Sequence, residues 1–182
     1  QALGLMPTTE SLQTLIMATA DESRLVRVRA AAGLAVFPKL AAPPAYQAQM
    51  QKANDDYLAS ITTRADQWTS HYNLGNYYLG QGDAKAAVAS YRTALQLDPQ
   101  AILPMVNMSL AHARMGENDQ AERALKQALK LAPVNAAANF NLGLLQAGRN
   151  DLQAAETSLK KAFAADPQMA QAAYNLCIIT AT

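Results

Sequence analysis

Residues 68–101 read WTSHYNLGNYYLGQGDAKAAVASYRTALQLDPQA, and this 34-residue pattern recurs further along the chain. The second and third copies occupy residues 102–135 and 136–169, and residues 170–182 begin a fourth. One asparagine stands at the same position of every copy: Asn73, Asn107, Asn141 and Asn175. A period of this length, with small residues at fixed positions, is typical of arrays of helical hairpins.

Small and apolar residues recur within each copy at helical spacing. In the first copy one set follows the pattern of a single helix face: His71, Leu74, Gly75 and Tyr78. A second set with similar spacing comprises Ala87, Tyr91, Ala94 and Leu95. Because Gly75 and Ala87 lack bulk, the two helices can approach closely while Tyr91 and Leu95 fill the space beside them.

Turn-forming residues separate the two helices of each copy. Turns and helix N-caps are expected at Gly82–Asp83, Asn118–Asp119 and Asn150–Asp151. Each second helix is expected to end at a pair that contains proline: Asp98–Pro99, Ala132–Pro133 and Asp166–Pro167. Since each hairpin can bury its apolar face only against its neighbours, the sequence predicts an all-α solenoid with a concave side.

The first copy resembles a tetratricopeptide repeat. The residues that carry the resemblance are Leu74–Gly75, Tyr78, Ala87, Tyr91, Ala94 and Pro99. The second copy departs from the motif at Met108, Ser109, His112 and Leu125, and the third at Gln146 and Leu159, but these exchanges keep the alternation of small and large residues. The resemblance implies a right-handed superhelix over residues 66–182 that binds another protein or peptide and performs no chemistry.

Residues 1–65 are expected to form an N-terminal helical segment. A hairpin is predicted over residues 8–37, with Thr8 or Thr9 capping its first helix and Asp21 its second. The second helix is expected to turn one face inward: Leu25, Val28, Ala32 and Ala35. Pro38 marks the stop of this hairpin.

A long helix is predicted over residues 44–64, after the loop at Pro43–Pro44. Its apolar stripe comprises Tyr46, Met50, Ala53, Tyr57 and Ile61. Its solvated side is expected to hold Gln47, Gln51, Lys52, Asp55 and Asp56. We expect this helix to pack on the first repeat and the hairpin to pack on the helix.

The stretch DESRLVRVRAAAGL at residues 21–34 resembles the second helix of a HEAT repeat. Arg24, Arg27 and Arg29 within it either bind an anion or, as the simpler interpretation, are solvated or hold the adjacent turn by hydrogen bonds. The order of HEAT-like hairpin, long helix and tetratricopeptide array is similar to the C-terminal region of some bacterial multihaem c-type cytochromes. That resemblance implies a periplasmic protein with a haem domain upstream of Gln1.

Charge and composition exclude several classes of partner. The chain has 15 Lys and Arg against 14 Asp and Glu over 182 residues, and neither half is basic, so nucleic acid is not an expected partner. No apolar run is long enough for a membrane span. The chain begins at Gln1 without a signal-peptide pattern, which indicates a fragment or a processed protein.

No catalytic motif is present. The sequence lacks a phosphate-binding glycine loop, an HExxH zinc motif and a CxxCH haem-attachment motif, so neither an enzyme nor a cofactor or metal site is expected. His71 and His112 occupy positions where the repeat places a large core residue. Cys177 shares its position with Gly75, Ser109 and Gly143, so a buried residue at a helix crossing is expected; the alternative is a reactive thiol.

The concave face is the candidate binding surface. Its expected residues form an apolar stripe beside a ladder of asparagines: Tyr72, Asn73, Asn76, Val106, Asn107, Leu110, Phe140, Asn141, Leu144, Tyr174 and Asn175. An amide offers a donor and an acceptor to the backbone of an extended peptide, and apolar side chains select its residues. The alternative is that the asparagines brace neighbouring repeats.

One binding mode of the family is disfavoured. The clamp that binds chaperone tails needs lysines and an arginine, and Tyr72, Ala137 and Asn141 stand at those places, although Asn76 and Asn107 match. The sequence therefore favours an interaction module for another kind of segment. The alternative function is a structural module that packs on an upstream haem domain or on a second copy of the chain.

The C-terminal helix is expected to be unfinished. Ala173, Leu176 and Cys177 should face the array. An apolar outer face is expected from Ala172, Leu176, Ile179 and Ala181. We expect something to cover this apolar face: either further residues of the protein or a second copy of the chain, which would form a homodimer through this helix.

Overall fold

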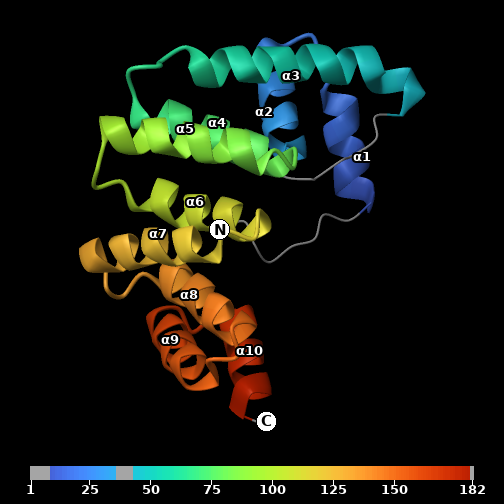
Figure 1. Cartoon of the computed structure of the whole chain (residues 1–182). Helices are drawn as coiled ribbons and strands as arrows, with labels where there is room; N and C mark the ends of the chain where they lie inside the picture. Colours follow the sequence, from blue (N-terminus) through green and yellow to red (C-terminus); the bar gives the residue numbers. More distant parts are fainter. Residues whose placement is uncertain (1–8, 36–42, 181–182) are drawn as a thin grey trace.

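The computed structural model describes residues 9–35 and 43–180, and within these ranges it is entirely helices, turns and loops (Figure 1). The N-terminal helices are α1 (Thr9–Ala18), α2 (Arg24–Leu34) and α3 (Gln47–Thr62), the last preceded by the 3₁₀ turn η1 (Pro44–Tyr46). The repeats comprise α4 (Trp68–Gly80), α5 (Ala84–Leu97), α6 (Ile102–Arg114), α7 (Asn118–Leu131), α8 (Ala136–Gly148), α9 (Leu152–Ala165) and α10 (Ala170–Thr180). No helix in the described ranges is both long and apolar enough to cross a membrane.

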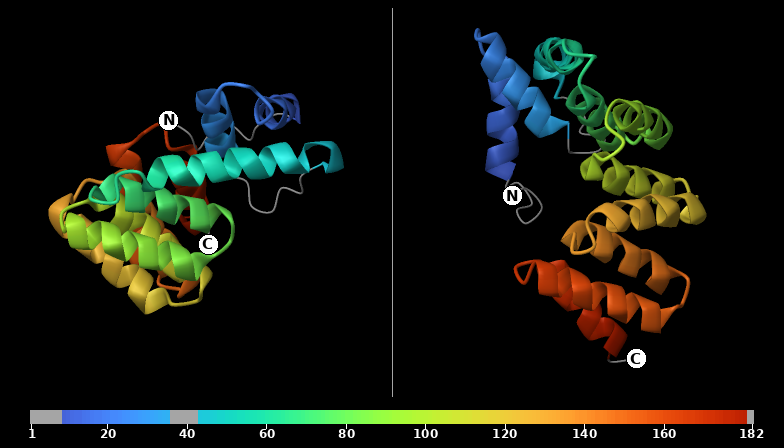
Figure 2. Two further views of the ribbon diagram at one scale, coloured as in Figure 1. Left: turned by 90° about the horizontal axis from the view of Figure 1, so that it is seen from above. Right: turned by 90° about the vertical axis from the view of Figure 1, so that its left-hand side faces the viewer.

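The repeats form a curved stack of helical hairpins. Figure 2 shows the pairs α4–α5, α6–α7 and α8–α9 following one another, with α10 at the C-terminal end. The first helices touch one another in the order α4, α6, α8, whereas no comparable contact joins α5 to α7 or α7 to α9 in the described part of the chain. The stack therefore bends toward its first helices, as a tetratricopeptide solenoid does.

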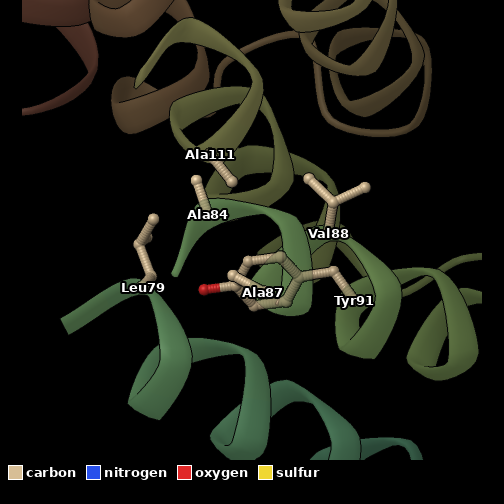
Figure 3. Packing of buried hydrophobic residues seen from close by; sticks show 6 residues of the cluster. All are labelled: Leu79, Ala84, Ala87, Val88, Tyr91 and Ala111. Atoms are coloured by element: carbon tan, nitrogen blue, oxygen red, sulfur yellow. The ribbon is translucent and has the colours of Figure 1, made fainter. Parts of the chain in front are cut away.

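Close helix crossings at two glycines hold the first and third hairpins together, as the sequence predicted. A Cβ atom on Gly75 would collide with the ring of Tyr91, and one on Gly143 would lie 2.8 Å from Cγ of Leu159. Tyr91 and Leu159 are fully buried. Figure 3 shows the ring of Tyr91 among the buried residues Leu79, Ala84, Ala87, Val88 and Ala111.

The turns follow the 34-residue register, and this corrects one prediction. Gly82, Gly116 and Asn150 have positive φ angles of 83°, 75° and 62°. Asp83 and Asp151 cap α5 and α9 through bonds from the backbone N–H groups of Ala86 and Ala154. The turn of the second repeat is Gly116–Glu117, and Asn118 is already helical, so the expected turn at Asn118–Asp119 is wrong. Glycine tolerates the left-handed conformation best, which places the turn there.

The N-terminal segment packs as expected, with α3 on α4, α2 on α3 and α1 on α2. Ala53 lies at the centre of the α3 stripe and is fully buried. The rings of Tyr57 and Tyr77 join α3 to α4 with their centroids 6.0 Å apart. The expected cap at Thr8, the end of the hairpin at residues 36–37 and the stop at Pro38 lie outside the described residues.

The inward face of α2 agrees only in part with the expected one: Ala35 is buried and Val28 and Ala32 are half-buried, but Leu25 is not. Leu25 is 62% exposed, and the buried residues are Arg27, Ala30, Ala31, Leu34 and Ala35. Arg27 sets this orientation because its guanidinium donates to the backbone oxygens of Asp21 and Glu22 and to the carboxylate of Asp56. Asp56 is therefore not on the solvated side of α3. The expected cap at Asp21 is wrong, because the N-cap of α2 is Ser23, and Asp21 accepts from the N–H of Ser23 in the turn before the helix.

Two of these arginines hold the structure together, in line with the simpler interpretation. Arg24 and Arg27 both pair with Asp56 across the α2–α3 contact. The bond from Arg27 lowers the pKa of Asp56. These contacts give Arg24 and Arg27 a structural role and leave no need for a bound anion.

The C-terminal helix α10 is turned differently from the prediction. Ala172 is fully buried against the array, whereas Ala173 and Cys177 are exposed, so the expected facing of these residues and the expected burial of the thiol are both wrong. Ala172 stands one period after Ala138, which is also fully buried. The position of Cys177 is covered in the other repeats by the second helix of the same hairpin, and no such helix follows α10 in the described residues.

Candidate functional site

Large apolar side chains are exposed along the first helices of the array. Leu103 and Leu110 on α6 are 51% and 39% exposed, Leu144 on α8 is 39% exposed, and Tyr174 and Ile178 on α10 are 68% and 47% exposed. Three of them stand one period apart, at the position of Leu110, Leu144 and Ile178. These side chains lie on the first helices, on the inner side of the bend, and we call them the apolar stripe; Leu110 and Leu144 line one cavity there.

A cavity of about 260 Å³ opens where α6, α7 and α8 meet. It is lined by Ser109, Leu110, Ala113, Asn118, Ala121, Leu125, Asn141, Leu144, Leu145 and Gly148. No charged residue lines it. Three of the residues expected in the binding groove, Leu110, Asn141 and Leu144, come together here.

Asn76 and Asn107 take part in a polar network between the first two repeats. The Asn76 amide oxygen accepts from the Tyr91 hydroxyl at 2.8 Å and from Nδ2 of Asn107 at 2.8 Å. The same Nδ2 lies 3.4 Å from the hydroxyl of Tyr72. Burial raises the pKa of Tyr91, so its hydroxyl stays protonated and donates. Both amides therefore brace the first repeat against the second.

The other asparagines of the ladder differ from this pair. Asn73 is exposed, and Asn175 donates to the backbone oxygen of Gln171 in its own helix. Asn141 lines the cavity, and no side chain among the described residues bonds to its amide. Asn76 and Asn107 therefore brace the repeats, whereas Asn141 faces the groove. The 34-residue spacing alone does not distinguish these two roles.

Two apolar residues of the predicted groove differ in burial. Val106 is only 5% exposed and packs in a core cluster with Met105 and Leu125, so it offers the groove almost no surface and its predicted role there is corrected. Phe140 is half-buried on α8. The period that placed these residues on one helix face does not distinguish the edge of the groove from the core beneath it.

Both histidines have structural contacts. His112 is 6% exposed, and its Nδ1 lies 2.6 Å from a carboxylate oxygen of Glu117. This contact explains why Glu117, at the N-cap of α7, does not cap the helix with its side chain. His71 is half-buried with Nε2 3.0 Å from the backbone oxygen of Ala65.

Sequence reasoning missed three residues of this face. Leu103 is exposed beside Val106, Arg114 donates to the backbone oxygen of Leu79 at 2.7 Å, and Gly148 lines the cavity. Arg114 and Gly148 stand one period apart, at the ends of α6 and α8. Extending the helix faces by one further turn would have found both.

Comparisons with known proteins agree with this fold. Two models of the tetratricopeptide repeat family match the chain, over residues 68–100 and 106–170. No curated protein sequence matches it.

Several solved structures are similar in fold. The first TPR domain of Spaghetti (RPAP3), bound to the HSP90 peptide SRMEEVD, has a TM-score of 0.62 and 21% identity over 64% of this chain and 94% of its own. A thermophilic TPR protein of Thermus thermophilus has a TM-score of 0.63 and 17% identity over 94% of this chain and 90% of its own. The MamA protein has a TM-score of 0.60 and 17% identity, covering 94% and 82%. At these identities the likeness shows the shared fold alone.

Proposed function

Because this chain belongs to the tetratricopeptide repeat family, we propose that it is a non-catalytic interaction module that binds an extended segment of a partner protein along its first helices. Solenoids of this kind present extended concave surfaces to their partners. One structure of similar fold holds a peptide of HSP90, which supports a peptide as the type of ligand. The proposed surface runs from Leu103 on α6 to Ile178 on α10.

The exposed apolar stripe is the observation that carries this proposal. The exposed side chains of Leu110 and Leu144 line one cavity, and the exposed Ile178 stands at the same position of the next first helix. Exposed apolar patches mark interaction sites. Scattered apolar residues would need no such explanation. The cavity between α6 and α8 adds a concave site of the kind that holds an anchoring side chain.

The charge of this face selects against an acidic tail. The positions that would hold the cations of a chaperone-tail clamp are Tyr72, Ala137 and Asn141. Arg114 is a nearby cation, and its guanidinium already donates to a backbone oxygen. A carboxylate buried here would lose its hydration without gaining a paired cation, which is costly. We therefore propose an uncharged, apolar segment as the ligand.

A displayed random-peptide library tests this function. Peptides selected on the wild-type chain are measured by fluorescence polarisation against Leu110→Asp, Leu144→Asp and Leu152→Asp. Leu152 is the matched control, because it is 38% exposed but lies at the start of α9, where an aspartate is well tolerated. We expect the first two variants to weaken binding by about tenfold or more, which corresponds to about 1.4 kcal/mol or more, and the control to bind as wild type.

A second candidate is a structural module that assembles through α10. Tyr174 and Ile178 are among its most exposed apolar residues, and Cys177 is exposed between them. A second copy or an upstream domain would cover this face, and the proposed periplasmic haem protein is one such setting. Sedimentation of wild type and of a Tyr174→Asp, Ile178→Asp variant tests self-association. A concentration-dependent dimer that the variant abolishes supports this candidate, and a strict monomer at high concentration contradicts the homodimer.

A further inference from the structure

The cavity between α6, α7 and α8 has a filled counterpart one repeat earlier. Five of its lining residues are Ala113, Asn118, Ala121, Leu125 and Leu145. One 34-residue period before them stand Leu79, Ala84, Ala87, Tyr91 and Ala111. With Val88, these earlier residues form the buried cluster drawn in Figure 3. The same positions thus form a packed core in the first repeat and a cavity in the second.

Two of the exchanges replace a large side chain by a smaller one, while Ala84 and Ala111 are replaced by the larger Asn118 and Leu145. Leu79 is 7% exposed and Tyr91 is fully buried, whereas their counterparts in the second repeat are Ala113 and Leu125. Removing the bulk of a leucine from a core leaves a space that the surroundings close only in part. At the position of Leu79 the second repeat therefore lacks a large side chain, and a cavity remains there although Leu145 is larger than Ala111.

A third exchange lies at the edge of the cavity. Arg114 lies at the end of α6 and donates to the backbone oxygen of Leu79, which ties the end of α6 to α4. Its counterpart at the end of α8 is Gly148. Chain neighbours aside, a Cβ atom on Gly148 would meet nothing within 4 Å. The adjacent Arg149 pairs with Asp119 and Glu122 on α7.

The lining determines which chemistry fits. All ten lining residues are uncharged, so a charged group would lose its hydration without compensation. An apolar cavity of about 150 Å³ already holds a benzene molecule. The present space of about 260 Å³ is therefore large enough for one aliphatic side chain.

The amide of Asn141 at the rim is available for a ligand. Its counterpart Asn107 bonds to Asn76 and lies against Tyr72, but one period later those two positions hold Leu110 and Val106, which have no polar side-chain atoms. In the described part of the chain no side chain replaces these partners. An amide in this setting can bond to both the N–H and the C=O of a peptide backbone.

We propose that this cavity is an anchor subsite that takes one uncharged aliphatic side chain of the bound segment, in the place that Leu79 fills in the first repeat. Asn141 bonds to the backbone of the same partner residue. Ala113 is then a specificity-determining residue, because its small size creates the space. The inference rests on the proposed function, since the anchoring residue belongs to the segment that the first helices bind.

A single-residue probe tests the subsite without knowledge of the partner. N-acetyl-leucine methylamide is titrated into the isotope-labelled chain, and the backbone amide of Gly148 and the side-chain amide of Asn141 are followed by NMR. The probes N-acetyl-lysine methylamide and N-acetyl-glutamic acid methylamide are titrated in parallel. We expect saturable shifts of both amides with the leucine probe alone.

Filling the cavity provides the decisive variant. Ala113→Leu restores the residue that the first repeat has, so we expect it to abolish the shifts while the melting temperature stays the same or rises. Ala147→Leu is the matched control, because it makes the same change one period later, outside the lining, and should leave the shifts intact. If Ala113→Leu does not fold, the comparison of the leucine probe with the charged probes on the wild type still decides whether the cavity selects an aliphatic side chain.

Three outcomes would overturn the subsite: no saturable shift with the leucine probe, equal shifts with the charged probes, or unchanged shifts in a folded Ala113→Leu. These outcomes are separate from those of the proposed function. Library peptides could depend on Leu110 and Leu144 but bind Ala113→Leu as tightly as wild type. This result would support the peptide-binding function and rule out the anchor subsite. A leucine probe that binds as expected on a chain that selects no peptides would show that the cavity takes an aliphatic side chain and would remove the proposed peptide-binding function.

Discussion

The hydroxyl of Tyr91 donates a hydrogen bond of 2.8 Å to the amide oxygen of Asn76, and this oxygen also accepts from Asn107 of the next repeat. Tyr91 is fully buried, so a core residue of the first hairpin is linked by polar contacts to the surface between two repeats. A buried donor or acceptor that loses its partner costs more than an exposed one. The members of the asparagine ladder should therefore respond differently to mutation.

Asn107→Ala should destabilise the fold, whereas Asn141→Ala should not. The first change removes a donor from the network and is expected to cost about 1–2 kcal/mol. The second removes an amide without a side-chain partner in the described residues, and its effect should stay within about 0.5 kcal/mol. Chemical denaturation of both variants measures the difference. Equal losses of stability would show that Asn141 braces the array as Asn107 does.

Bulk at the close helix crossings should be poorly tolerated. Gly75→Ala drives a Cβ atom into the buried ring of Tyr91, and Gly143→Leu overfills the contact with Leu159. Each should lower the free energy of unfolding by about 1–3 kcal/mol or more. Gly148→Ala is the control, because its Cβ would lie in open space and the change favours helix. Thermal melts measure the loss of stability. If Gly148→Ala lowered the melting temperature as much as Gly75→Ala does, this packing would be contradicted.

Acid should weaken the contact between α2 and α3. The Arg27 guanidinium holds the pKa of Asp56 below its ordinary value of 3.8. A carboxylate with a lowered pKa in the folded state contributes stability above its unfolded pKa, and this contribution disappears as the pH falls through the folded pKa. Wild type should therefore be more stable than Asp56→Asn at neutral pH, and the difference should shrink below about pH 4. Melting curves across this range test it; a difference that does not change with pH would argue against the ion pair.

Helix α3 should exchange its amide protons slowly. Ala53 is fully buried, and α3 lies between α2 and α4. Slow exchange requires the helix to stay folded on its neighbours. Hydrogen exchange followed by mass spectrometry should therefore show protection of the peptides around Ala53 as well as those of the repeats. Rapid exchange throughout residues 47–62 would show that the N-terminal segment does not stay packed on the array.

The regular features of this fold could be predicted from the sequence because they follow from the period. The close crossings at Gly75 and Gly143 follow from small residues that recur opposite large ones. Helix ends before Pro99, Pro133 and Pro167 followed from the restriction that proline places on the chain. The turn at Gly116 does not follow from the local sequence, because Asn118–Asp119 carries a stronger turn signal than Gly116–Glu117 does. The 34-residue register of Gly82 and Asn150 indicates it.

The remaining errors concern contacts between segments distant in sequence. Asp56 looks solvated on its own helix, and only the approach of Arg27 from α2 gives it a partner. Asn76 and Asn107 are far apart in sequence, so their bond was not visible in either repeat alone. The cavity beside Ala113 is a difference between two repeats rather than a motif. It emerges when Leu79 and Ala113 are compared at the same position.

The central claim is that a partner segment binds along the first helices of the array. A crystal structure of the chain with a library-selected peptide tests it most directly. The peptide should lie across α6 and α8, with an apolar side chain in the cavity beside Ala113 and its backbone within hydrogen-bonding distance of the Asn141 amide. A peptide bound to the second helices α7 and α9, or to the α1–α3 segment, would contradict the claim.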